Sequence, residues 1–189
     1  MKWGSKMKKI IGSIAVFIIL LITFSVAGTN TTSTPNKKLL LTAKQLQRNH
    51  FKKLKNGDRL VIIDYSLPVF KKRLWVINTK TDEIIFYSRV GHAWRSGIIY
   101  ATNFSNVPKS NKSSIGSFVT TNTYKGKFGY SLNIKGLDKG VNNFADRRRI
   151  IFHKMTNKPW SLGCFTVPQK STKKLINLIK SGTFVYVSS

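Results

Sequence analysis

The segments RRIIFH (148–153) and SLGCFTV (161–167) decide how this chain is interpreted. The first is rich in β-branched and aromatic residues, and it predicts a buried strand that ends at His153. The loop KMTNKPW (154–160) then leads to Cys164, the only cysteine. A strand end and a short return loop bring an imidazole close to a thiol. Since an imidazole promotes formation of the nucleophilic thiolate, the pair is a candidate for nucleophilic catalysis.

Three roles are open for a lone cysteine in an exported chain: intermolecular pairing, inert burial and reactivity. A reactive role predicts that His153 lowers the pKa of the Cys164 thiol. Ser161 would then orient the imidazole as a third member of the site. Gly163 lets the backbone approach a ligand closely, and amides near the cysteine would hold an oxyanion.

The remaining sequence predicts a mostly β (α+β) domain with a helix near each end. Apolar residues at helical spacing predict helices over 42–57, stopped by Gly57 and with His50 at the core edge, and over 170–182, closed by Gly182. Between and after them, short apolar segments predict strands over 59–66, 73–79, 83–90, 116–124, 130–137 and 183–187. The residues KTD (80–82) predict a hairpin turn, and there is no internal repeat or second domain.

The composition is strongly basic. There are 33 Lys and Arg against 6 Asp and Glu, a formal net charge of +27 over 189 residues. This excess favours a polyanionic partner, such as nucleic acid, an anionic membrane leaflet or an acidic cell-wall polymer. Because no nucleic-acid-binding motif is present, we expect no nucleic-acid partner.

The N-terminus has the pattern of an export segment. Lysines precede a mostly apolar run over 10–27, which ends in the small residues SVA (25–27). We expect a signal peptide or an N-terminal membrane anchor over 1–27, a flexible tether over 28–38 and one catalytic domain over 39–189. Both alternatives for 1–27 place that domain outside the cytoplasm, in the periplasm or cell envelope.

Several motifs together resemble a known family. IIFH…SLGCFTV resembles the His…Ser-x-Gly-Cys signature of the murein L,D-transpeptidase catalytic-domain family. Segments that resemble one branch of this family follow in the same order: GHAWRSG (91–97), ATNFSN (101–106), KSSIG (112–116), the run over 124–148 and LINLIKSGTFVYV (175–187). The resemblance covers roughly residues 60–189 and implies an L,D-transpeptidase-like β-sandwich or barrel.

What the resemblance implies is acyl transfer on peptidoglycan stem peptides, without metal or cofactor. Cys164 would attack the carbonyl of the diamino acid at stem position three and release the terminal D-alanine. The side-chain amine of a second stem would resolve the thioester and form a 3→3 cross-link. On the matching positions, His153 is the general base, Ser161 a helper, and the backbone of Gly163 and Cys164 the oxyanion hole.

The candidates for substrate binding come from the loops around this motif: His92, Ser96, Ser114, Trp160 and Thr166. His92 matches a histidine of the family branch and is assigned to the wall of the active site, with a solvated or capping role as the alternative. The serines are alternatively loop hydrogen bonders. Trp160 and Trp94 either line a groove or have a structural role.

The chain also departs from the family pattern. It has Lys154 where the family usually has glycine, Thr166 where many members have arginine, and Trp160 and Leu162 beside Ser161. These differences leave the nucleophile and base in place and affect substrate recognition. Two alternatives to the transpeptidase therefore stay open: an L,D-carboxypeptidase or peptidase with the same nucleophile, and a non-catalytic cell-wall-binding relative.

Overall fold

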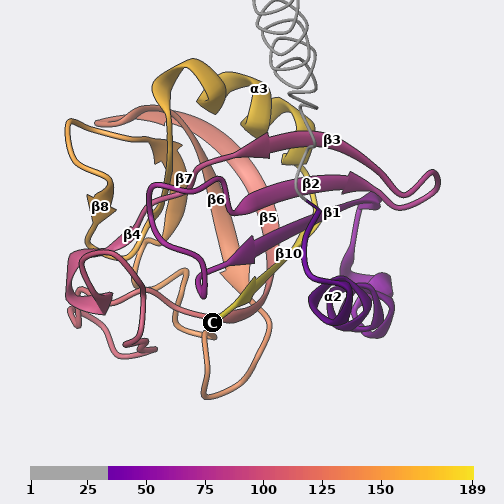
Figure 1. The fold of residues 1–189 in the computed structure, drawn as a ribbon, viewed down its shortest axis with the longest axis horizontal. Helices are drawn as coiled ribbons and strands as arrows, with labels where there is room; N and C mark the ends of the chain where they lie inside the picture. The colour runs from indigo at the N-terminus through magenta and orange to yellow at the C-terminus, as the bar shows by residue number, and fades with distance from the viewer. Residues whose placement is uncertain (1–33) are drawn as a thin grey trace, which may run out of the picture. The chain divides into compact units, whose positions relative to one another are not determined.

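A computed structural model describes residues 34–189. They form an eight-stranded sheet in the order β3-β2-β1-β10-β5-β6-β7-β9, a two-stranded sheet β4-β8, and two helices (Figure 1). The mostly β fold with a helix near each end is confirmed. In chain order the elements are α2 (Lys37–Asn49), the 3-10 turn η1 (Phe51–Lys53), β1 (Asn56–Asp64), β2 (Leu74–Asn78), β3 (Glu83–Ser88), β4 (His92–Ala93), the 3-10 turn η2 (Trp94–Ser96), β5 (Gly116–Gly126), β6 (Gly129–Gly136), β7 (Ile151–Lys154), β8 (Trp160–Ser161), β9 (Phe165–Val167), α3 (Gln169–Ile179) and β10 (Thr183–Ser188).

The predicted signal peptide or anchor over 1–27 lies outside the described residues. The end of the predicted flexible tether over 28–38 is helical, because α2 begins at Lys37. The side chain of Asn36 caps this helix by accepting a hydrogen bond from the Lys38 amide at 2.9 Å. Within residues 34–189, no helix is long and apolar enough to cross a membrane.

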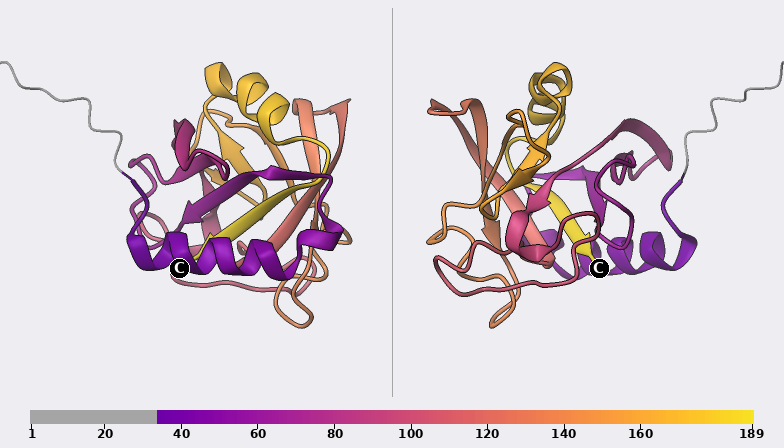
Figure 2. Two further views of the ribbon diagram at one scale, coloured as in Figure 1. Left: turned by 90° about the vertical axis from the view of Figure 1, so that its right-hand side faces the viewer. Right: turned by 60° about the vertical axis from the view of Figure 1, so that its left-hand side comes forward.

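The two faces of the large sheet bury two separate clusters. Successive residues of a strand point to opposite faces, so Val61 and Ile63 of β1 enter one cluster while Leu60 and Ile62 enter the other. Helix α3 covers the first cluster with Leu175, Ile176 and Ile179, and α2 covers the second with residues such as Ala43. Figure 2 shows the two helices on opposite sides of β1 and β10.

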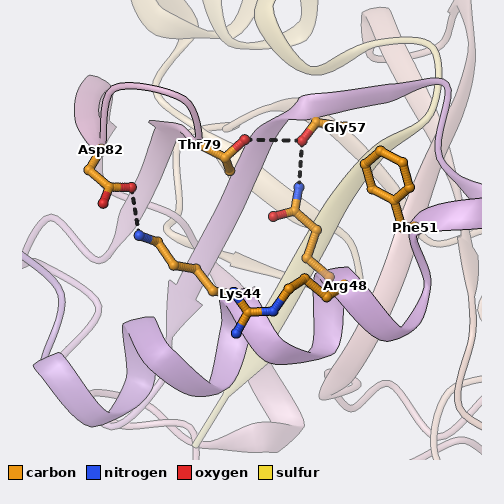
Figure 3. Close-up of a pocket in the computed structure, with 7 residues that line it drawn as sticks. Lys44, Arg48, Phe51, Gly57, Thr79 and Asp82 are labelled. Carbon is orange, nitrogen blue, oxygen red and sulfur yellow. Dashed lines mark hydrogen bonds and ion pairs between the residues drawn. The ribbon is translucent and has the colours of Figure 1, made fainter.

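Polar contacts fix α2 against the first strands (Figure 3). The amide of Gln47 donates to the carbonyl oxygens of Gly57 and Arg59, at 3.0 and 2.9 Å. Lys44 forms an ion pair with Asp82 at 2.6 Å, which links the helix to the β2–β3 turn. A pocket of about 250 Å³ lies between these groups.

The ends of both helices differ from the prediction. Helix α2 ends at Asn49, and Gly57, predicted as its stop, lies at the start of β1. The predicted helix was too long because Phe51, whose spacing fits the helix, belongs to the 3-10 turn that follows it. Helix α3 ends at Ile179, and Ser181 and Gly182 reverse the chain with φ of 66° and 88°. The hairpin turn between β2 and β3 is confirmed.

An aromatic cluster supports the strands that carry the Cys–His motif. Phe165 of β9 stacks on Phe152 of β7 with ring centroids 4.9 Å apart, and meets the edge of Phe118 at 5.7 Å. All three side chains are fully buried. Phe165 directly follows Cys164 in sequence, so the position of the cysteine depends on how this ring packs.

Replacing Phe165 by alanine should destabilise the domain by about 4 kcal/mol, because it removes a large buried ring and leaves a cavity. Urea denaturation measures the change. Phe70→Ala is the matched control, since Phe70 is 58% exposed and its loss should change stability by less than about 0.5 kcal/mol. Equal effects of the two substitutions would contradict the assignment of Phe165 to the core.

Candidate active site

One cleft of about 690 Å³ contains both residues of the Cys–His motif. Its apolar lining comes mainly from Trp94, Phe128, Ile150, Trp160 and Leu162. Its remaining lining residues are Arg148, Arg149, His153, Thr156, Lys158, Ser161, Gly163, Cys164 and Thr166. Of the predicted site residues, the structure therefore brings six together: Cys164, His153, Ser161, Gly163, Trp160 and Thr166.

The parallel pairing of β7 with β9 sets the geometry of the cleft. Phe152 is in register with Phe165 and His153 with Thr166. Side chains alternate along a strand, so the two phenylalanines enter the core while His153 and Thr166 face the cleft. Cys164 stands two residues before Thr166 and is on the same side. The hydroxyl oxygen of Thr166 is buried without a hydrogen-bond partner within residues 34–189.

The imidazole of His153 has a defined orientation. It stacks on Phe128 with ring centroids 4.1 Å apart. Its Nδ1 lies 2.8 Å from the carbonyl oxygen of Lys154, and since a carbonyl only accepts, Nδ1 carries the proton. Burial lowers the pKa of His153 below its ordinary value. The neutral ring therefore has a basic Nε2, which is the state that a general base needs.

Ser161 does not orient this imidazole. Its hydroxyl donates to the carbonyl oxygen of Cys164 at 2.7 Å and accepts from the Gly163 amide at 3.1 Å. Ser161 therefore shapes the turn that presents the cysteine, and the Lys154 carbonyl orients the histidine instead. The Gly163 amide, predicted to hold an oxyanion, is already engaged by Ser161. Gly163 itself has φ of 141°, which favours glycine.

The thiol of Cys164 differs from the sequence-based expectation. Its Sγ lies 3.7 Å from the carbonyl oxygen of Arg149, and no hydrogen bond joins it to His153 among the described residues. Burial raises the pKa of the thiol, and the backbone N–H of Ile151 and the charge of Arg148 oppose this to a smaller extent. The prediction that His153 lowers this pKa is therefore wrong for the free protein. The shifts of both pKa values favour a neutral thiol and a neutral imidazole.

Three predicted substrate-binding residues do not line the cleft. His92 is fully buried, where its Nδ1 accepts from Arg73 at 2.7 Å and its Nε2 donates to the Gly97 carbonyl at 2.8 Å. Ser96 is buried and accepts from the Ser113 amide. Ser114 is buried too, and donates to a backbone carbonyl. The assignment of His92 to the wall of the site is corrected to a structural role, because its ring is occupied on both nitrogens.

The two tryptophans flank the cleft as the sequence analysis suggested. Trp160 on β8 and Trp94 on η2 both line it. Trp160 donates through Nε1 to the carbonyl oxygen of Ile98 at 2.8 Å, which fixes the loop after η2. Trp94 is 50% exposed, so its ring borders both the cleft and the solvent.

The structure adds Arg148 and Phe128 to the site. Arg148 belongs to a run of three arginines (147–149) in which nothing in the sequence indicates which one turns inward. Phe128 lies in the turn between β5 and β6, far from the motif in sequence. Phe128 is missed because it reaches the cleft only through the folding of the sheet, and Arg148 is missed because the sequence near His153 does not show which arginine is half-buried.

The comparisons with known proteins agree with the fold. Residues 31–188 match the model of a family described as the L,D-transpeptidase catalytic domain, and the chain belongs to this family. The helical cell shape determining protein Pgp2 of Campylobacter jejuni, solved as a mutant, superposes with a TM-score of 0.51 at 10% identity, over 76% of this chain and 53% of that one. The chain thus spans about half the length of that protein.

A second similar structure is an L,D-transpeptidase of Stackebrandtia nassauensis, with a TM-score of 0.45 at 16% identity, over 89% of this chain and 87% of that one. No curated protein matches the sequence. The family that the sequence motifs resemble is therefore confirmed by the family model.

The buried state of His92 predicts a pH dependence of stability. Burial lowers the pKa of His92, whereas the unfolded imidazole titrates near about 6.5. Between about pH 7 and about pH 5 the unfolded state binds more protons, so stability should fall as the pH falls. In His92→Gln, urea denaturation at both pH values should show a smaller decrease than in the natural protein. An identical decrease would contradict the assignment.

Proposed function

We propose that this chain is an exported cysteine acyltransferase that acts on peptidoglycan stem peptides and forms 3→3 cross-links. The observation that carries the proposal is the single cleft in which Cys164 and an oriented, neutral His153 lie on the same face of the sheet. Membership of the L,D-transpeptidase catalytic-domain family supports the reaction class. Export rests on the sequence pattern of residues 1–27.

In the proposed first half-reaction, Nε2 of His153 accepts the thiol proton while Sγ of Cys164 attacks the carbonyl of the third stem residue. The bond to the terminal D-alanine breaks, and the imidazolium returns its proton to the leaving amine. A thioester on Cys164 remains. Because thiol and imidazole are both neutral before binding, the proton moves as the substrate reacts, and general-base catalysis describes the step better than a preformed ion pair.

In the second half-reaction, the side-chain amine of another stem attacks the thioester and restores the thiol. The lining of the cleft supports an amine rather than water as the acceptor. Trp94, Phe128, Trp160 and Leu162 give it apolar walls, and apolar walls reduce the access of water to a reactive intermediate. The departures at Trp160 and Leu162 thus fall on the surfaces that a stem peptide would contact.

Incubation of the protein with a tetrapeptide stem should yield free D-alanine and a mass increase on Cys164, detected by intact-protein mass spectrometry. Cys164→Ala should give neither product. His153→Ala should slow the release of D-alanine by about 10²-fold or more, since it removes the general base. The conservative control Ser171→Ala, on helix α3 and outside the cleft lining, should react normally. D-alanine release by the Cys164→Ala variant would disprove the proposal.

We also propose that the basic surface holds the enzyme on acidic cell-wall polymers. The net charge of +27 supports this, because charges on exposed surfaces attract polyanions over about a Debye length. Binding to isolated wall sacculi should weaken strongly between about 0.05 and about 0.5 M salt. Cys164→Ala should bind equally well, since it changes no basic residue. Binding that does not depend on salt would contradict an electrostatic attachment.

A further inference from the structure

The guanidinium of Arg148 occupies an unusual environment at the edge of the cleft. It is half-buried and donates four hydrogen bonds over 2.5 to 3.2 Å. The acceptors are all neutral: the carbonyl oxygens of Ser105 and Lys112 and the hydroxyls of Ser110 and Ser114. Within residues 34–189, no carboxylate lies at ion-pair distance from it.

These bonds decide what Arg148 is able to bind. A guanidinium has five N–H donors, and both donors on Nη1 and both on Nη2 are used. Only the Nε–H remains. A carboxylate is recognised by a fork of two parallel N–H groups, and Arg148 has no such fork left. Arg148 therefore acts on groups in the cleft through its positive charge, and it has no pair of free N–H donors with which to bind a carboxylate there.

A half-buried cation without a counterion is costly unless an anion forms beside it. Among the residues that line the cleft, Cys164 is the one side chain that becomes an anion. The two are held close through Gly163, the residue before the cysteine. A Cβ placed on Gly163 would lie 3.4 Å from Nη2 of Arg148, so the turn packs directly against the guanidinium.

We propose that Arg148 is a positioning residue whose fixed positive charge stabilises the thiolate of Cys164, and that it does not bind a carboxylate of the substrate. The inference rests on the proposed function in that Cys164 is the nucleophile. Burial lowers the pKa of Arg148 and raises the pKa of the Cys164 thiol, and the attraction between the two groups opposes both shifts, in agreement with the geometry.

Other groups near the thiol do not replace this charge. Burial lowers the pKa of His153, which favours its neutral form. Burial raises the pKa of Tyr65 to about 12, so its hydroxyl also stays neutral. Arg149 and Lys158 also line the cleft, but Arg148 is the cation that packs against the turn carrying Cys164.

The test is the pH dependence of alkylation of Cys164, the only cysteine, by the neutral reagent iodoacetamide, measured on the full-length chain in mild detergent. In Arg148→Met the thiol pKa should rise by about one pH unit, which slows alkylation about tenfold at a fixed pH below the pKa. Arg148→Lys should stay near the natural profile, because it keeps the charge. Arg147→Met removes the charge of the neighbouring arginine, which is exposed and does not line the cleft, and should not move the profile.

An unchanged alkylation profile in folded Arg148→Met would overturn the proposal. If Arg148→Met does not fold, the Arg148→Lys variant decides the question. An alkylation profile like that of the natural protein, together with a lowered melting temperature, supports the role of charge. A thiol pKa raised by about one pH unit overturns it. With a tetrapeptide stem, Arg148→Met should lower kcat rather than raise KM. A raised KM with an unchanged profile would show that Arg148 binds the substrate. Alkylation needs no stem peptide, so a failure of D-alanine release would not affect this result.

Discussion

The stacking of Phe152 on Phe165 is the contact on which the arrangement of the cleft depends. It locks the register of β7 against β9, and side chains alternate between the faces of a strand. With both phenylalanines in the core, His153, Cys164 and Thr166 must face the cleft. A slip of one residue would turn the thiol inward and expose the rings. The core and the reactive face are thus fixed by the same contact.

The shortage of acidic residues shapes the interior as well as the surface. With 6 Asp and Glu in the chain, the inward-facing arginines are satisfied by neutral groups. Arg73 is fully buried, and donates to the carbonyls of Val90 and Leu67 and to His92. Arg148 is held in the same way. Carbonyls satisfy the donors without cancelling the charge. Arg73 has the carboxylate of Asp64 within electrostatic reach, whereas Arg148 has no carboxylate at ion-pair distance within residues 34–189.

Burial and packing determine which features of the fold and the site could be predicted from the sequence. Periodicity and β-branched segments predicted the longer strands but not the short strands β4, β8 and β9. A thiol and an imidazole on neighbouring segments predicted their common cleft. Burial of a polar loop side chain carries no such pattern: His92 resembles a site residue in sequence, yet it serves as a partner of Arg73. Nor does the run over 147–149 show which arginine turns inward. The prediction of a lowered pKa for the Cys164 thiol failed because burial raises this pKa, and burial depends on packing that a sequence motif does not show.

The two neutral groups also have a consequence for an enzyme that works outside the cytoplasm, as proposed. Oxidation of cysteine proceeds mainly through the thiolate. Burial raises the pKa of the Cys164 thiol, which reduces the fraction of thiolate and slows the reaction with oxidants. Arg148 then contributes most when the proton has moved to His153 and the charge on sulfur is present. In the proposed mechanism, burial thus disfavours the free thiolate, and the charge of Arg148 acts on the sulfur when the thiol loses its proton.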